Sequence, residues 1–164
     1  MEKLKVHKGH VNLLSDIEEL EEFFGSLKQG EVLTFDWETT GLEYDALPLG
    51  LSLHQKGVSP CFVPTDYFFT KGIPMEEIAR VCNDNFKDYK LIAHNAKYDS
   101  MINVMNGIKD ENFKIYADTL IMIHCVDPAA EKQLWQRIVQ QKIRNQAKVL
   151  SLSHNQEKSE RLRQ

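Results

Sequence analysis

Hydrophobic and polar positions alternate with a period of two in the middle of the chain and with a helical period near its start. Residues 31–38, "EVLTFDWE", predict a strand, and residues 47–54 and 58–64 predict two more, separated by a turn at "QKG". Over residues 15–24 the apolar positions are three and four apart, and Ser15 with Glu18 forms a capping box. A helix is therefore predicted to begin at Ser15.

Helical and strand-like patterns then follow one another. Residues 74–86 predict a helix, 90–94 a short strand, 96–105 a second helix and 113–117 a further strand, and a third helix is predicted after Asp118. Three strands followed by helix–strand units are typical of an α/β fold. We expect a mixed sheet whose first three strands are antiparallel, with helices on its faces.

Composition is that of a globular domain of ordinary size, with 164 residues of which 42% are hydrophobic. No stretch has the length of a membrane span, and the start lacks the apolar core of a signal peptide, so a cytoplasmic location is expected. Cys61, Cys82 and Cys125 are far apart and include no C-x-x-C pair. This spacing favours reduced cysteines in the core over a disulfide framework or a zinc site.

Charge divides the chain into two parts. Residues 1–128 hold 12 Lys and Arg against 21 Asp and Glu, whereas residues 129–164 hold 8 against 3. An acidic body argues against broad binding to a nucleic-acid backbone, although it allows a small site at which divalent metals offset the carboxylates. We predict one domain over 1–128 and, over 129–164, a basic amphipathic helix with a polar end.

Two carboxylates lie near the end of the first predicted strand. Side chains two positions apart share a face of a strand, so Asp36 and Glu38 point the same way and can share a cation. A cap on the turn that follows is the alternative. After the strand at 90–94, Asn95 and Asp99 project from one side of a helix. Here the alternative is that Asn95 caps this helix while Asp99 favours its first turn.

Three segments, "FDWETTGL", "HNAKYD" and "IYADTLIMIHCVDP", carry a specific resemblance. In this order and at these separations they resemble the proofreading 3′–5′ exonuclease domain of DNA polymerase I-type (family A) polymerases, within the ribonuclease H-like DEDD exonuclease superfamily. The resemblance covers about residues 15 to 128 and implies a ribonuclease H-like mixed sheet flanked by helices. It also implies that Asp36, Glu38 and Asp99 are catalytic and hold two divalent ions, Mg²⁺ or Mn²⁺.

The same resemblance implies a substrate cleft. Thr39 would contact the terminal nucleotide, Leu42 would wedge against its base, and Asn95 and Tyr98 would line the cleft. The residues alone leave simpler alternatives open: Leu42 in the core, Thr39 as a turn former, and Tyr98 packed under the helix. For Asp118, followed by a helical apolar run, a helix N-cap is favoured over a metal ligand. His94 is expected to be a packing residue, because it has no partner at ligand spacing.

One motif of the family is missing. The family's third motif, Y-x-x-x-D or H-x-x-x-D, supplies a fourth carboxylate and the group that positions the attacking water. This chain has no Asp after Asp127, and His124 precedes Asp127 by three positions rather than four. The chain can be a fragment, its tail can have replaced the motif, or Asp118 or a partner's residue can complete the site.

Two functions are therefore considered. The first is an exonuclease, weak or incomplete in this chain, that removes nucleotides from single-stranded or frayed DNA 3′ ends by two-metal hydrolysis. The second is an inactive exonuclease-like module that binds nucleic acid or a replication protein such as a DNA polymerase. The missing motif weakens the expectation of exonuclease activity but does not exclude it.

Overall fold

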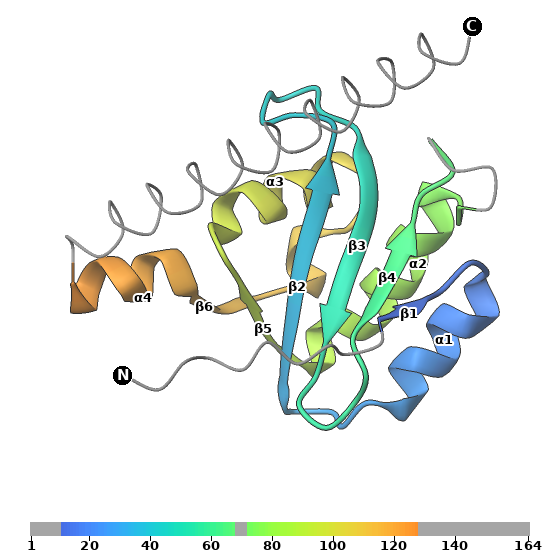
Figure 1. Ribbon diagram of the computed structural model, residues 1–164, viewed down its shortest axis with the longest axis horizontal. Helices are drawn as coiled ribbons and strands as arrows, with labels where there is room; N and C mark the ends of the chain where they lie inside the picture. The colour runs from blue at the N-terminus through green and yellow to red at the C-terminus, as the bar shows by residue number, and fades with distance from the viewer. Residues whose placement is uncertain (1–10, 68–71, 128–164) are drawn as a thin grey trace, which may run out of the picture. The chain divides into compact units, whose positions relative to one another are not determined.

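The computed structural model describes residues 11–67 and 72–127 (Figure 1). The chain divides into two compact units, Met1–Thr119 and Leu120–Gln164. The first unit holds the sheet and the helices α1 (Ile17–Ser26), α2 (Met75–Asn85) and α3 (Ala96–Met105), while α4 (Thr119–Val126) begins at its last residue. Two short 3-10 turns, η1 (Phe86–Asp88) and η2 (Asp110–Asn112), follow α2 and α3. The region predicted at 129–164 lies outside the described residues and stays a prediction.

Six strands form one sheet in the order β1-β4-β3-β2-β5-β6 (Figure 1). β2 pairs antiparallel with β3, and β3 with β4, whereas β5 pairs in parallel with β2, and β6 with β5. An antiparallel meander continued by parallel strands on the other side of its first strand is the ribonuclease H-like arrangement, so the predicted fold class is confirmed. The strands are β1 (Asn12–Leu13), β2 (Val32–Thr39), β3 (Pro48–His54), β4 (Cys61–Pro64), β5 (Lys90–Ala93) and β6 (Ile115–Asp118).

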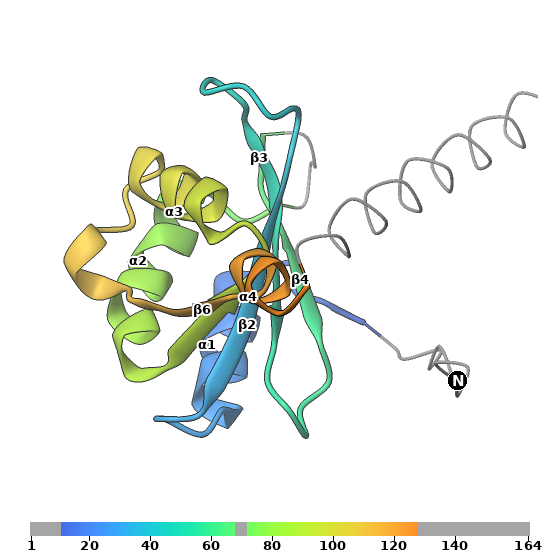
Figure 2. The ribbon, with the colours of Figure 1, turned by 90° about the vertical axis from the view of Figure 1, so that its left-hand side faces the viewer.

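The core lies between the sheet and three helices. Figure 2 shows α1, α2 and α3 on the same face of the sheet. Each contributes at least one fully buried aliphatic side chain, namely Leu20, Ile78 and Ile102. Along β2, the odd-numbered residues from Leu33 to Trp37 are buried and the even-numbered residues are exposed. Strand alternation thus separates the residues of β2 that build the core from those that are available for chemistry.

The first helix begins one residue later than the sequence pattern indicates. Its N-cap is Asp16, whose carboxylate accepts a hydrogen bond from Glu19 N at 2.9 Å, while Glu19 accepts one from Ser15 N at 2.8 Å. The prediction that Ser15 caps the helix with Glu18 is therefore wrong. Both pairs have capping-box spacing, and the carboxylate of Asp16 has the additional advantage of its negative charge beside the positive end of the helix dipole.

Two further features differ from the sequence-based picture. β1 was not predicted, because two residues are too few for a periodic pattern; it pairs in parallel with β4. Cys61 and Cys82 are buried as expected, but Cys125 is exposed. It belongs to "TLIMIHCV", which is apolar on most sides, so periodicity does not indicate its orientation. Among the described residues, no helix has both the length and the apolar character needed to cross a membrane.

Candidate functional site

Three neighbouring parallel strands have their carboxyl ends along one edge of the sheet, the edge that runs across the strand ends. β2, β5 and β6 are neighbours that run in the same direction. Glu38 lies near the end of β2, Asn95 follows β5, and Asp118 is the last residue of β6. In open α/β sheets, ligands bind outside the carboxyl ends of parallel strands, where the connections leave a crevice. We therefore take this edge as the candidate functional site.

Asp36 and Glu38 are both exposed on one face of β2, as their spacing predicts. They stand opposite Ser52 and Gly50 of β3, and the register shifts directly after Glu38. Trp37, between them, points to the other face and is only 4% exposed. The regular part of the strand thus places both acids side by side at its end, although their catalytic role stays a prediction.

Asp99 is brought to the same strand from the first turn of α3. It is 2% exposed, and its Oδ1 accepts a hydrogen bond from the backbone N–H of Trp37 at 3.0 Å. The pairing of β2 with β5 covers Val32–Thr34, so Trp37 lies beyond it and its N–H is open to the helix. Because Trp37 stands between Asp36 and Glu38, this hydrogen bond holds the third acid against the backbone that carries the other two.

The acids influence one another electrostatically. Burial raises the pKa of Asp99 to about 7, with smaller upward contributions from the charges of Asp36 and Asp118, and the Trp37 N–H opposes the rise. Partial burial and the charge of Glu38 also raise the pKa of Asp36. Like charges held close together shift carboxyl pKa values upward, and a bound cation relieves that repulsion. A bound cation is therefore expected to stabilise the charged form of these carboxylates.

Asp118 contacts the N-terminus of α3, whereas the sequence pattern predicts that it caps the helix that follows it. Its two carboxylate oxygens accept hydrogen bonds from the backbone N–H groups of Asn95 at 3.0 Å and Ala96 at 2.8 Å. Asn95 has a left-handed backbone, with φ of 64°, and makes no capping hydrogen bond with its side chain. The alternative in which Asn95 caps α3 is therefore wrong, because the carboxylate of Asp118 takes that position from the neighbouring strand.

His94 is the residue that sequence reasoning missed. The sequence predicts a packing residue, yet His94 is exposed, and its Nδ1 lies 2.9 Å from Thr119 Oγ1. It also lowers the pKa of Asp36, which places its ring within electrostatic reach of the acids. The only sequence signal was its position directly after a buried strand, at the same sheet edge as Asp36.

The acids have the donor chemistry that suits a hard divalent cation. Carboxylate oxygens are the ligands that Mg²⁺ and Mn²⁺ prefer. In the described part of the chain, however, no three His, Cys, Asp or Glu side chains are already gathered in a metal-binding arrangement. Asp99 is turned toward the N–H of Trp37 and Asp118 toward α3. The predicted metal site is therefore supported by donor type and charge and stays a proposal.

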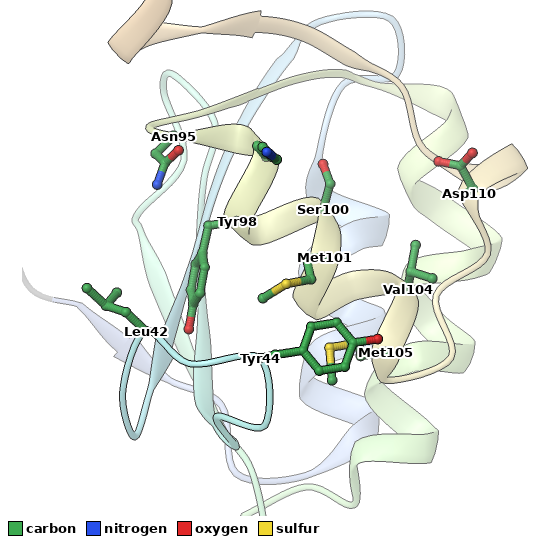
Figure 3. Close-up of a pocket in the computed structure, with 10 residues that line it drawn as sticks. Leu42, Tyr44, Asn95, Tyr98, Ser100, Met101, Val104, Met105 and Asp110 are labelled. Atoms are coloured by element: carbon green, nitrogen blue, oxygen red, sulfur yellow. The ribbon is translucent and has the colours of Figure 1, made fainter.

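Three of the four predicted substrate residues line one groove. Leu42, Asn95 and Tyr98 border a groove of about 740 Å³ between α3 and the loop that joins β2 to β3 (Figure 3). Leu42 is 79% exposed, so the alternative that placed it in the core is wrong. Asp36, Glu38 and Asp99 are not among the lining residues. The groove lies on the same two elements as the acids, β2 with its following loop and α3.

Thr39 contacts this groove through Tyr98. Its Oγ1 lies 2.8 Å from the Tyr98 hydroxyl and donates to Gly41 O at 2.6 Å, and the Tyr98 hydroxyl also donates to Gly41 O at 2.8 Å. The turn-forming alternative for Thr39 is thus observed. A contact with substrate stays a prediction for Thr39, which supports the loop bearing Leu42 in either case.

The indole of Trp37 makes a second hydrogen bond to α3. Its Nε1 donates to Asn103 Oδ1 at 2.7 Å, and Asn103 is fully buried. Among the buried side-chain atoms of the described residues, Asn103 Nδ2 has no hydrogen-bond partner. Trp37 therefore binds α3 at Asp99 through its backbone and at Asn103, one turn later, through its side chain.

We predict that Trp37→Phe destabilises the protein, because the variant keeps the backbone bond to Asp99 but leaves the Asn103 amide without any partner. A buried polar group that loses its partner costs about 1–3 kcal/mol. Urea unfolding measures the loss. In the double variant Trp37→Phe/Asn103→Leu both polar partners are removed, so part of the stability should return. A double variant no more stable than Trp37→Phe would contradict this role of Asn103.

The comparisons with known proteins give structural neighbours only. The chain matches no protein-family model and no curated protein sequence. It is similar in structure to the EXO domain of Nibbler from Aedes aegypti, with 12% identity and a TM-score of 0.47, over 72% of this chain and 52% of that one. It is also similar to the RNase domain of the yeast Pop2 protein, with 14% identity and a TM-score of 0.47, over 64% of this chain and 61% of that one. The chain thus spans less than two thirds of either neighbour.

Proposed function

We propose that this chain is a DEDD-type exonuclease module that removes nucleotides from the 3′ end of nucleic acid, with single-stranded or frayed DNA as the expected substrate. The observation that carries the proposal is the hydrogen bond from Trp37 N–H to Asp99. It brings the acid of the "HNAKYD" segment to the strand of the "FDWETTGL" segment. Trp37 and Asp99 are 62 positions apart, and their hydrogen bond joins two segments that were selected for their resemblance to one family.

The residues of the chain divide into two roles in this proposal. Asp36, Glu38 and Asp99 would hold Mg²⁺ or Mn²⁺, and the bound ions would supply an activated water and stabilise the leaving 3′ oxygen. Leu42 and Tyr98 would bind the terminal nucleotide beside them. The carbonyl oxygen of Gly41, which accepts from both hydroxyls, would hold Thr39 and Tyr98 together. A DNA polymerase or another replication protein is the partner that the sequence resemblance suggests.

A second candidate function rests on the missing motif. The sequence has no Asp after Asp127 to serve as the fourth carboxylate. Asp118, the other acid that affects Asp99, already accepts two backbone hydrogen bonds at the start of α3. An inactive module that binds nucleic acid or a replication protein is the function favoured by these two observations.

Product analysis separates the two functions. The purified chain is incubated with 5′-labelled single-stranded DNA, and in parallel with RNA, in the presence of Mn²⁺. The exonuclease reading predicts a ladder shortened from the 3′ end. Asp36→Ala should reduce the rate more than about 100-fold, since losing even an outer partner of a metal ligand costs about 10- to 100-fold.

Asp45→Ala is the matched control, because Asp45 is an exposed acid on the loop after β2 and should leave the rate unchanged. Equal degradation by the wild type and Asp36→Ala would identify a contaminating nuclease. Intact DNA and RNA with the wild type would support the inactive module and contradict the exonuclease.

A further inference from the structure

His94 lies at the strand ends beside the acids but has no role in the proposed function. It directly follows β5, which lies between β2 and β6 in the sheet (Figure 1). The pairing of β2 with β5 ends with Thr34 opposite Ile92, and the same parallel register, continued by two residues, brings His94 next to Asp36. Side chains two positions apart share a face of a strand. His94 and Asp36, both exposed, therefore belong to the same face of the sheet.

Two observations support this placement of His94. On the other side of β5, the register with β6, continued by one residue, brings His94 next to Thr119. There Nδ1 of His94 lies 2.9 Å from Thr119 Oγ1, as this register requires. Partial burial and Glu38 raise the pKa of Asp36, and His94 opposes the rise. An imidazole thus stands beside a carboxylate at the strand ends.

The contact with Thr119 determines which imidazole nitrogen is available. The Thr119 hydroxyl donates its single hydrogen to Ala93 O at 3.3 Å, so its oxygen accepts at the contact with His94. His94 then donates through Nδ1–H, and its Nε2 carries the lone pair. Histidine ligands of metal ions usually have this arrangement, in which the other ring nitrogen donates to a neighbouring oxygen and fixes the orientation of the ring.

A nitrogen ligand at this position would relieve the shortage of ligands in the chain. The sequence has no Asp after Asp127 for the fourth carboxylate, and Asp118 already accepts two backbone hydrogen bonds. No three ligands are gathered among the residues that the structure describes. Asp36 and Glu38 are exposed on one face of β2, however, so rotation of their side chains can bring oxygens to an ion at Nε2.

We propose that Nε2 of His94 is a ligand of the ion held by Asp36, and that this nitrogen makes the site prefer Mn²⁺ to Mg²⁺. Mg²⁺ requires oxygen ligands in near-octahedral geometry, whereas divalent first-row metals such as Mn²⁺ also bind imidazole. The inference rests on the proposed function, because Asp36 is one of its metal-binding acids. It goes beyond the set of carboxylates that the resemblance implies.

Pulsed EPR of bound Mn²⁺ tests the proposal without requiring catalysis. The full chain is given substoichiometric Mn²⁺, and electron spin-echo envelope modulation detects nitrogen bonded to the ion. The wild type should show nitrogen modulation, and labelling its histidines with heavy nitrogen should change the modulation frequencies. His94→Asn should lose the modulation, because Asn keeps a donor for Thr119 Oγ1 but has no counterpart of Nε2.

His54→Asn is the matched control, because His54 is also exposed and lies on β3 opposite Thr34, two positions before Asp36 on the neighbouring strand. This variant should retain the nitrogen modulation. Loss of the modulation in His54→Asn instead of His94→Asn would assign the nitrogen to β3 and overturn the proposal.

Metal affinities test the preference for Mn²⁺. The Mn²⁺ affinity of His94→Asn should fall at least about tenfold, since losing even an outer partner of a metal ligand costs about 10- to 100-fold. Its Mg²⁺ affinity, measured by displacement of Mn²⁺, should change less than about threefold, because Mg²⁺ is held by oxygens. Thr119→Val should weaken Mn²⁺ binding but keep the nitrogen modulation, whereas Thr119→Ser keeps the hydroxyl and should match the wild type.

Three further results would overturn the proposal. They are bound Mn²⁺ without nitrogen modulation, modulation retained in His94→Asn, and an equal loss of Mg²⁺ and Mn²⁺ affinity in that variant. Absence of Mn²⁺ uptake by the wild type would overturn it together with the metal site. The product ladder reports the nuclease separately: shortened DNA without nitrogen modulation contradicts only the role of His94, and nitrogen modulation with intact DNA contradicts only the exonuclease.

Discussion

Asp99→Asn should stabilise the metal-free protein at neutral and alkaline pH. The folded protein holds the pKa of Asp99 at about 7, against 3.8 for the free side chain. A raised pKa means that the stability contributed by this group is fully present below pH 3.8 and is lost as the pH rises through 7. A difference of about three in pKa corresponds to a loss of about 4 kcal/mol of folding stability at most. Asn keeps an oxygen that can accept from Trp37 N–H and has no charge to bury.

The measurement is urea unfolding of wild type and variant in chelator, from pH 4 to pH 8. The two proteins should have similar free energies of unfolding near pH 4. From there to pH 8 the free energy of unfolding of Asp99→Asn should increasingly exceed that of the wild type. Asp45→Asn, on an exposed loop, should follow the wild type throughout. A difference between Asp99→Asn and the wild type that does not change with pH would show that Asp99 is not buried as described.

Mg²⁺ or Mn²⁺ should stabilise the wild type, and Asp36→Asn should abolish this response. Ligand that binds only the folded state adds about 2.7 kcal/mol at a free concentration one hundred times the dissociation constant. For a chain of this size, this corresponds to a rise in melting temperature of roughly 5–10 °C. Without metal, Asp36→Asn should be slightly more stable than the wild type, because it removes a carboxylate whose pKa is raised by partial burial and by repulsion with Glu38.

Thermal unfolding at increasing metal concentration checks this expectation. A matched ionic strength of Na⁺ separates site binding from general screening, because screening does not discriminate between variants. Asp45→Asn should keep the full metal response. If Asp36→Asn retains the wild-type rise in melting temperature, the three acids do not form a joint site, and each has only its structural role.

The order of helices and strands could be predicted from the sequence because each longer element has a clear hydrophobic period. In the helix predicted over 74–86, the apolar residues Ile78 and Phe86 are fully buried, although α2 ends at Asn85 and Phe86 belongs to η1. Details without a unique local signal were missed. Ser15 and Asp16 are both good N-caps, each with a Glu three positions later, and only the folded helix shows which is used. β1 depends on pairing with β4, almost fifty positions away, and two residues carry no periodic signal.

The candidate site shows the same division between local and long-range information. That Asp36 and Glu38 share a face follows from the geometry of a strand, and the structure has this arrangement. The capping of α3 by Asp118 joins residues 22 and 23 positions apart, so no local pattern could assign it. His94 was misassigned for a similar reason, since its influence on Asp36 requires β5 to lie beside β2. The burial of Asp99 likewise depends on the packing of α3 against Trp37.

The most direct test of the central claim, that Asp36, Glu38 and Asp99 act as one divalent-metal site, is a Mn²⁺ titration followed by the EPR signal of the free ion. The wild type should remove Mn²⁺ from solution with saturable uptake of one or two ions per chain. Asp36→Asn and Glu38→Gln should each lose most of this uptake, and Asp45→Asn should retain it. Equal uptake by the wild type and both site variants, or no saturable uptake by the wild type, would contradict the account.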